Sequence, residues 1–156
     1  MTALPKATAE ERVQWEVSQK EYDLIREVFL HHCDRELAGD IDGVLETLTP
    51  DCVYELPQTG QRWDGLDGAR RFYQELLGAF PDNSWEIHDV VLGPQGVMSQ
   101  VTMTAHQAAP FAGVNDVGHE VRWRLNNMFP WDPEAKKFRG ETLYYFRPES
   151  EYFVSK

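Results

Sequence analysis

A change of hydrophobic period near Pro81-Asp82 restricts most strongly how this chain of 156 residues can fold. Before this point, apolar residues recur at the three- and four-residue spacing of amphipathic helices. After it, apolar and polar residues alternate, which is the period of a half-buried strand. Helices first and an antiparallel sheet second predict one α+β domain, with the helices packed against one face of the sheet.

Capping and turn residues place the expected elements. Thr8 and Glu11 form the capping-box pattern that opens a first helix, and Gly39 is expected to end it. Asp40 can cap a short second helix that ends near Pro50. A strand over 52–56 and a turn-rich segment over 58–64 come before a third helix. The strands after the period change are expected at 85–92, 97–106, 119–131 and 138–146.

Composition and charge limit the class of protein. The chain is 42% apolar and carries a formal net charge of −11, so nucleic acid and acidic membrane surfaces are not expected partners. It shows neither a signal-peptide pattern nor an apolar run of bilayer length, which favours a cytoplasmic location.

Cys33 and Cys52 lack disulfide-framework and zinc-ligand spacing, so no metal site is expected. One domain is expected over 1–156, with a short extension at about 1–8 and a tail at about 147–156.

Two polar residues fall on faces that otherwise point inward. His32 extends the helical stripe of Val28 and Phe29, and Asn127 stands in an alternating row of inward apolar residues. His32 is either a hydrogen-bonded core histidine or an acid–base group, because histidine titrates near neutrality. Asn127 either bonds an irregular strand or donates its NH2 hydrogens to a ligand carbonyl.

A third polar signal lies at the end of the strand over 97–106. If this strand runs one residue further, Gln107 shares the inward face and His106 points to the other side. Strand ends often carry bulges, so either side chain could reach an interior pocket.

Several segments, taken in order, resemble the SnoaL-like branch of the NTF2-like superfamily. Residues 38–43 and 48–54 resemble its helix-to-strand passage, and 65–73 leading into 79–82 resembles its next helix. Pro110-Phe111-Ala112-Gly113 resembles its loop, and 138–145 resembles its last strand. The resemblance implies a cystatin-like cone, with three N-terminal helices packed on a curved, mostly antiparallel sheet. It also implies a homodimer.

The superfamily includes polyketide cyclases, ketosteroid isomerases and noncatalytic binding proteins, so the residues must decide the chemistry. The tyrosine, base aspartate and oxyanion-hole aspartate of ketosteroid isomerases match His32, Leu56 and Asn127 here. The base is therefore missing, and isomerase activity by that mechanism is not expected. The histidine that cyclases carry near the loop matches Gln107, with His106 one residue earlier.

The leading hypothesis is an enzyme without metal or organic cofactor that acts on an apolar, carbonyl-bearing molecule such as a polyketide. It would cyclise, isomerise or eliminate, with His32 or His106 carrying the proton and Asn127 and Gln107 holding the enolate oxygen. The expected apolar wall consists of Tyr54, Leu56, Trp63, Phe72, Trp123, Phe129 and Tyr145. A noncatalytic protein that binds a small ligand and a dimeric interaction module are the alternatives.

Overall fold

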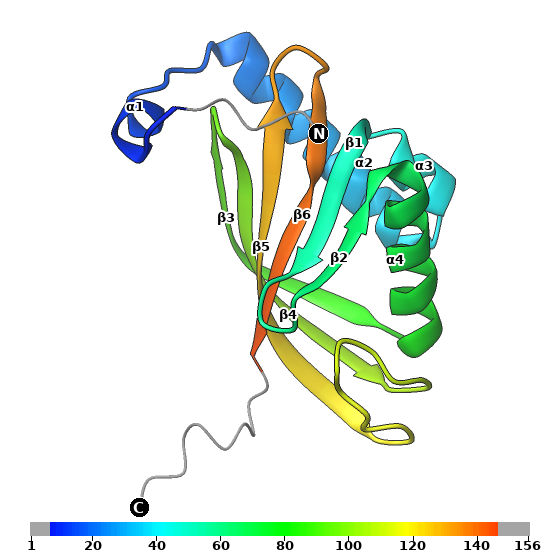
Figure 1. Ribbon diagram of the computed structural model, residues 1–156. Helices are drawn as coiled ribbons and strands as arrows, with labels where there is room; N and C mark the ends of the chain where they lie inside the picture. The colour runs from blue at the N-terminus through cyan, green and yellow to red at the C-terminus, as the bar shows by residue number, and fades with distance from the viewer. Residues whose placement is uncertain (1–6, 147–156) are drawn as a thin grey trace, which may run out of the picture.

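A computed structural model describes residues 7–146, and this part of the chain contains four helices and six strands (Figure 1). The helices are α1 (Ala9–Val13), α2 (Gln19–Leu37), α3 (Ile41–Leu45) and α4 (Gly65–Ala79). The strands are β1 (Leu48–Leu56), β2 (Gln61–Asp64), β3 (Ser84–Gly93), β4 (Gly96–His106), β5 (Glu120–Asp132) and β6 (Lys137–Phe146). The expected tail over 147–156, and residues 1–6 of the expected extension, lie outside the described residues.

The structure divides the expected first helix into two. Thr8 caps α1 through both bonds of the capping box, but this helix ends at Val13. Ser18 then caps α2, because its hydroxyl accepts a hydrogen bond from the backbone N–H of Glu21. The break lets α1 lie on the opposite side of the sheet from α3 and α4 (Figure 1).

The six strands form one curved sheet in the order β2-β1-β6-β5-β4-β3. Only β1 and β6 run parallel, and the other neighbours are antiparallel. The predicted α+β class and the mostly antiparallel sheet are thus confirmed. The turn-rich segment over 58–64 also holds the short strand β2, in which Trp63 points inward and pairs with Tyr54.

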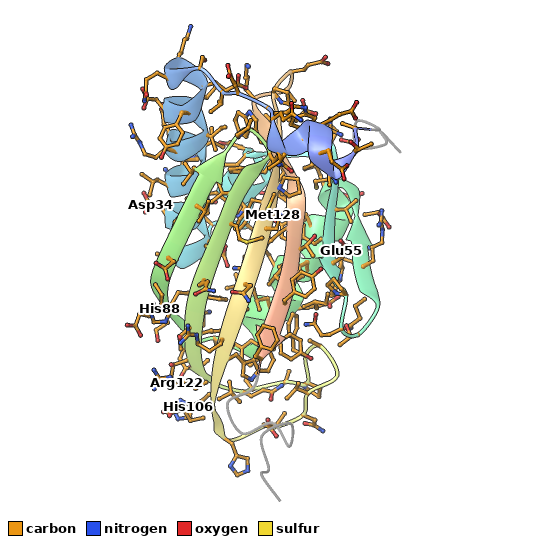
Figure 2. All side chains as sticks on the ribbon, turned by 90° about the vertical axis from the view of Figure 1, so that its left-hand side faces the viewer. Asp34, Glu55, His88, His106, Arg122 and Met128 are labelled. Carbon is orange, nitrogen blue, oxygen red and sulfur yellow. The ribbon has the colours of Figure 1, made fainter. Side chains whose placement is uncertain are left out.

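The helices α2, α3 and α4 pack over the inward face of the sheet and enclose an aromatic core. Its largest fully buried side chains include Tyr54, Phe72, Tyr73, Phe80 and Phe138. Figure 2 looks onto the other face of the sheet, where the side chains of β3 to β6 stand free except beneath α1. No helix among residues 7–146 is long and apolar enough to cross a membrane.

Candidate functional site

His32 is completely buried on the inward side of α2, and both of its ring nitrogens have partners. Nδ1 lies 2.7 Å from Thr47 Oγ1, and Nε2 lies 3.0 Å from the Tyr73 hydroxyl. Thr47 donates its own hydrogen to the Val44 carbonyl at 2.7 Å, so it must accept from His32 Nδ1–H. Burial, followed by the nearby His31, lowers the pKa of His32 to about 3. His32 is therefore neutral, and its Nε2 accepts a hydrogen bond from Tyr73.

Two tyrosines continue this chain of hydrogen bonds through the core. The hydroxyls of Tyr54 on β1 and Tyr73 on α4 lie 2.9 Å apart. Because Tyr73 donates toward His32, Tyr54 is the donor to Tyr73. Burial raises the pKa of both tyrosines well above the usual value, so both keep their hydrogens. The chain joins α4, β1 and α2 around one buried polar cluster.

Two carboxyl groups, which the sequence reasoning missed, lie beside this cluster, Glu141 buried and Glu36 with a side chain that is 18% exposed. Glu36 lies one helical turn after His32 with Oε2 at 3.8 Å from His32 Nε2, and Glu141 on β6 is 4% exposed. Burial raises the pKa of Glu36 to about 7, against a smaller lowering by a hydrogen bond with Tyr73. Burial, followed by the charge of Glu36, raises the pKa of Glu141 well above its usual value. Tyr73 thus has one hydrogen and two competing acceptors, His32 and Glu36.

A cavity of about 50 Å³ separates α2 from the inward face of β3, β4 and β5. Glu36 faces it from α2 and Asn127 faces it from β5. Asn127 is 7% exposed, and its Oδ1 has no hydrogen-bond partner among the described residues. The other residues that line the cavity are Phe29, Cys33, Trp85, Ile87, Ser99, Val101 and Phe129. The cavity therefore brings an ionisable carboxyl and an amide group with an unpartnered oxygen together in largely apolar surroundings.

The remaining ionisable group at this cavity is a thiol. Burial and then the charge of Glu36 raise the pKa of Cys33 to about 12, so the thiol stays protonated and is a poor nucleophile. In the described part of the chain, no three His, Cys, Asp or Glu side chains gather as a metal site. The chemistry that the cavity can support with its own groups is proton transfer by Glu36.

His32 does not line this cavity, although it lies close to it. Its ring centroid is 5.3 Å from that of Phe129, which does line the cavity two residues after Asn127. The structure therefore brings the predicted imidazole and carboxamide to the same region of the interior. The ionisable side chains that line the cavity together with Asn127 are nevertheless Glu36 and Cys33.

The two candidates at the end of β4 do not reach the cavity. Gln107 is 1% exposed and holds the loop that follows it: its amide donates to the carbonyls of Ala109 and Val114 and accepts from the backbone of Asp116. His106 points away from the interior, with a side chain 65% exposed, as Figure 2 shows at the end of β4. A hydrogen bond with Asp82 at 2.8 Å raises the pKa of His106.

The expected apolar wall mostly fills the interior. Only Phe129 of that set lines the cavity, and Trp123 and Tyr145 stack on each other at 4.7 Å between ring centroids. The remaining members are at most 6% exposed and belong to the core, namely Tyr54, Leu56, Trp63 and Phe72.

These two carboxyls had a signal in the sequence. Glu36 lies seven residues after Phe29 and four after His32, which continues the inward stripe of α2. Glu141 alternates with Leu143 and Tyr145 on the inward face of β6. A charged residue in phase with a buried stripe is the pattern that would have found both.

This cone-shaped α+β domain with an enclosed polar cluster is the architecture of a known family. The family model described as SnoaL-like domain matches residues 29–143, and the chain belongs to this family. Among curated proteins, none matches the sequence significantly.

Solved structures show the same fold at low sequence identity. A protein described as a SnoaL-like polyketide cyclase from Jannaschia sp. CCS1 is 20% identical, with a TM-score of 0.71 over 84% of this chain and 91% of that one. AclR from Streptomyces galilaeus, described as a hydroxylase, is 20% identical, with a TM-score of 0.64 over 80% and 76%. A protein described as a ketosteroid isomerase from Kribbella flavida DSM 17836 is 19% identical, with a TM-score of 0.59 over 87% and 91%.

The raised pKa of Glu36 predicts how stability depends on pH. This carboxyl has an ordinary pKa of 4.5 and titrates near 7 in the folded protein, so the folded state holds the proton more tightly. Stability is therefore lost as pH rises from about 4.5 to about 7. Relative to Glu36→Gln, the unchanged protein should lose about 2–3 kcal/mol over this interval. Urea unfolding of both proteins at pH 4.5 and pH 8 measures the difference, and parallel pH curves would contradict it.

Proposed function

We propose that the protein is an acid–base enzyme that acts on an apolar molecule bearing a carbonyl group, such as a polyketide. Its reaction would be a cyclisation, an isomerisation or an elimination performed by its own side chains, without a metal or organic cofactor. The observation that carries the proposal is that Glu36, whose pKa is about 7, and Asn127, whose amide Oδ1 has no partner among the described residues, line the same cavity.

In the proposed reaction, the Glu36 carboxylate removes a proton from the carbon beside the carbonyl. The electron pair of the C–H bond moves to the carbonyl oxygen, and the Asn127 amide donates a hydrogen bond to the enolate that forms. Protonated Glu36 then returns the proton at another atom, which completes an isomerisation, or to a leaving group, which completes an elimination. A pKa near the working pH suits both steps, because both protonation states are populated.

His32 takes a positioning role in this proposal instead of the proton-carrying role that the sequence suggested. Its pKa of about 3 leaves it neutral, and its Nδ1–H is committed to Thr47. Its free lone pair orients the Tyr73 hydroxyl, which also hydrogen-bonds with Glu36. The imidazole thereby adjusts how strongly the Glu36 carboxylate is stabilised.

Substrate entry requires the cavity to widen. Sites for small molecules usually occupy about 300–1,000 Å³, whereas this cavity has about 50 Å³. The edge strand β3 contributes Ile87, whose side chain is 47% exposed, to the cavity wall opposite α2. We propose that the substrate enters between α2 and β3, because β3 is the edge strand of the sheet.

The comparisons support the substrate class without fixing it. Polyketide cyclase and ketosteroid isomerase, the descriptions of two of the similar structures, both denote reactions of carbonyl compounds. The similar structure described as a hydroxylase shows that the same fold is associated with other chemistry.

The proposed function is tested by proton exchange, which needs no knowledge of the natural substrate. The protein is incubated in D2O with 2-tetralone and a set of larger aromatic ketones, and deuterium beside the carbonyl is followed by mass spectrometry. Exchange faster than in buffer is expected for at least one ketone. Binding without accelerated exchange across the set would favour the noncatalytic binding protein instead.

We also propose that the chain forms a homodimer through the outward face of its sheet. This face exposes four large apolar side chains, Val91 and Met98 as a cross-strand pair and Tyr144 and Phe146 on β6. Exposed apolar clusters of this kind are typical of protein interfaces.

Light scattering should give twice the chain mass of 18.0 kDa. The double substitution Met98→Lys and Tyr144→Lys should yield a monomer, because it places charges in the apolar contact. Leu30→Lys, at a position 55% exposed on α2, is the matched control and should remain dimeric. A monomeric unchanged protein at working concentration would contradict this proposal.

A further inference from the structure

A second, larger cavity of about 660 Å³ lies beneath the N-terminal segment, at the closed end of the β5–β6 hairpin. Most of its apolar lining comes from the segment before α2 and from β5 and its turn, and Pro94 adds to it: Trp15, Val17, Met128, Pro130, Trp131 and Pro133. Figure 2 shows α1 in front of the strand ends, beside the labelled Met128. The two cavities share no lining residue.

Hydrogen bonds tie both sides of this cavity together. The side-chain amide of Gln95 donates to the Arg12 carbonyl at 3.3 Å, and the Trp131 backbone N–H donates to the Gln95 carbonyl at 3.0 Å. The Trp131 indole N–H donates to Glu21 on α2 at 3.0 Å. A volume of about 660 Å³ falls within the usual range for sites that hold small organic molecules.

Two arginines at this cavity have hydrogen-bond donors without acceptors. The Nε atoms of Arg12 and Arg139 are buried and have no partner among the described residues. Arg139 keeps one ion pair, from Nη2 to Asp132 at 2.7 Å, whereas Arg12 forms none within residues 7–146. A guanidinium donor that is shielded from water and unpartnered costs free energy unless an acceptor is supplied.

The acidic residues at the cavity do not supply that acceptor. Asp132 is held by Arg139 and by the backbone N–H groups of the turn that follows it, and Glu21 is held by Trp131 and Lys136. The other two carboxylates, Glu16 and Glu134, are exposed at the rim. The Nε of Arg12 is therefore shielded from water, and Arg12, unlike Arg139, forms no ion pair in the described part of the chain.

We propose that the 660 Å³ cavity binds an apolar, ring-containing carboxylate, with Arg12 pairing with the carboxylate and Trp15 and Trp131 contacting the rings. Arginine and carboxylate form strong charge-assisted hydrogen bonds, and flat rings pack well on indole faces. This site is separate from the cavity of Glu36 and Asn127, and the inference does not depend on the proposed catalysis.

The probe that tests this site is 1-pyrenebutyrate, and its neutral counterpart is 1-pyrenebutanol. The two molecules share four fused rings and differ in the terminal group, so fluorescence titration of both isolates the contribution of the carboxylate. We expect the butyrate to bind about tenfold or more tightly than the butanol. Arg12→Gln should abolish this preference and leave butanol binding unchanged, whereas Trp15→Ala should weaken both ligands.

Three further variants test whether the guanidinium of Arg12 is the group that binds the carboxylate. Arg26→Gln removes a matched, exposed arginine that pairs with Asp23 on α2, and Glu36→Gln alters the inner cavity; neither should change binding. Arg12→Lys keeps the charge but lacks the forked guanidinium, so an intermediate affinity is expected. The proposal is overturned if neither probe binds, if Arg12→Gln keeps the preference, or if Glu36→Gln removes binding.

Discussion

Glu36→Gln is expected to slow proton exchange beside a ketone carbonyl by a factor of about 10²–10⁴, the usual contribution of a positioned acid–base group. Glutamine keeps the size and polarity of the side chain but cannot accept the proton. The exchange rate of the unchanged protein should rise as pH passes through about 7 and then level off, because the carboxylate form is the active one. Initial rates of deuterium incorporation over a pH series measure both effects.

The control for this variant is Glu27→Gln, which removes an exposed carboxylate from the same helix. It should leave the exchange rate and its pH profile unchanged. Urea unfolding of both variants separates loss of chemistry from loss of folding. If Glu36→Gln exchanged protons at the unchanged rate, Glu36 would be excluded as the base and the proposed mechanism would fail with it.

Gly140→Ala is expected to cause the largest loss of stability among single small substitutions. Gly140 on β6 pairs with Val53 on β1 and has a φ of +109°, a region that residues with a side chain rarely adopt. An added Cβ would collide with the backbone carbonyl of Val53. Overpacking and backbone strain together should cost about 2–6 kcal/mol, measured by urea unfolding followed by circular dichroism.

The matched control is Gly78→Ala on α4, where a Cβ would meet no atom within 4 Å. Alanine favours a helix over glycine by about 1 kcal/mol, so this variant should be as stable as the unchanged protein or slightly more. Equal unfolding midpoints for the Gly140→Ala variant and the unchanged protein would show that the β1–β6 pair tolerates the extra atom.

Much of the fold could be predicted because it follows from local periodicity. The four strands after Pro81 were placed within one residue of their observed ends, since each is at least ten residues long. The strand β2 has only four residues, too few for alternation to be recognised among turn residues. The break between α1 and α2 was missed because Val13 and Val17 keep helical spacing across it.

The candidate site was predictable only in part, for a physical reason. His32 and Asn127 are 0% and 7% exposed, as their positions on inward faces indicate. Glu36 escaped attention because a charged residue on a helix is usually solvated, and its partial burial depends on α4 and β6, which are distant in sequence. Gln107 points inward, where its amide holds the next loop. The preceding residue, His106, therefore points to the outer side of the strand.

The parallel pairing of β1 with β6 has a consequence for how the chain folds. It joins residues 48–55 to residues 138–142, so the centre of the sheet closes only when segments about 90 positions apart meet. Contacts of such long sequence separation slow folding, because the ordering of the intervening loop precedes the gain from pairing. During synthesis, the β1–β2 hairpin can therefore join the sheet of β3 to β6 only after β6, the last strand, has been made.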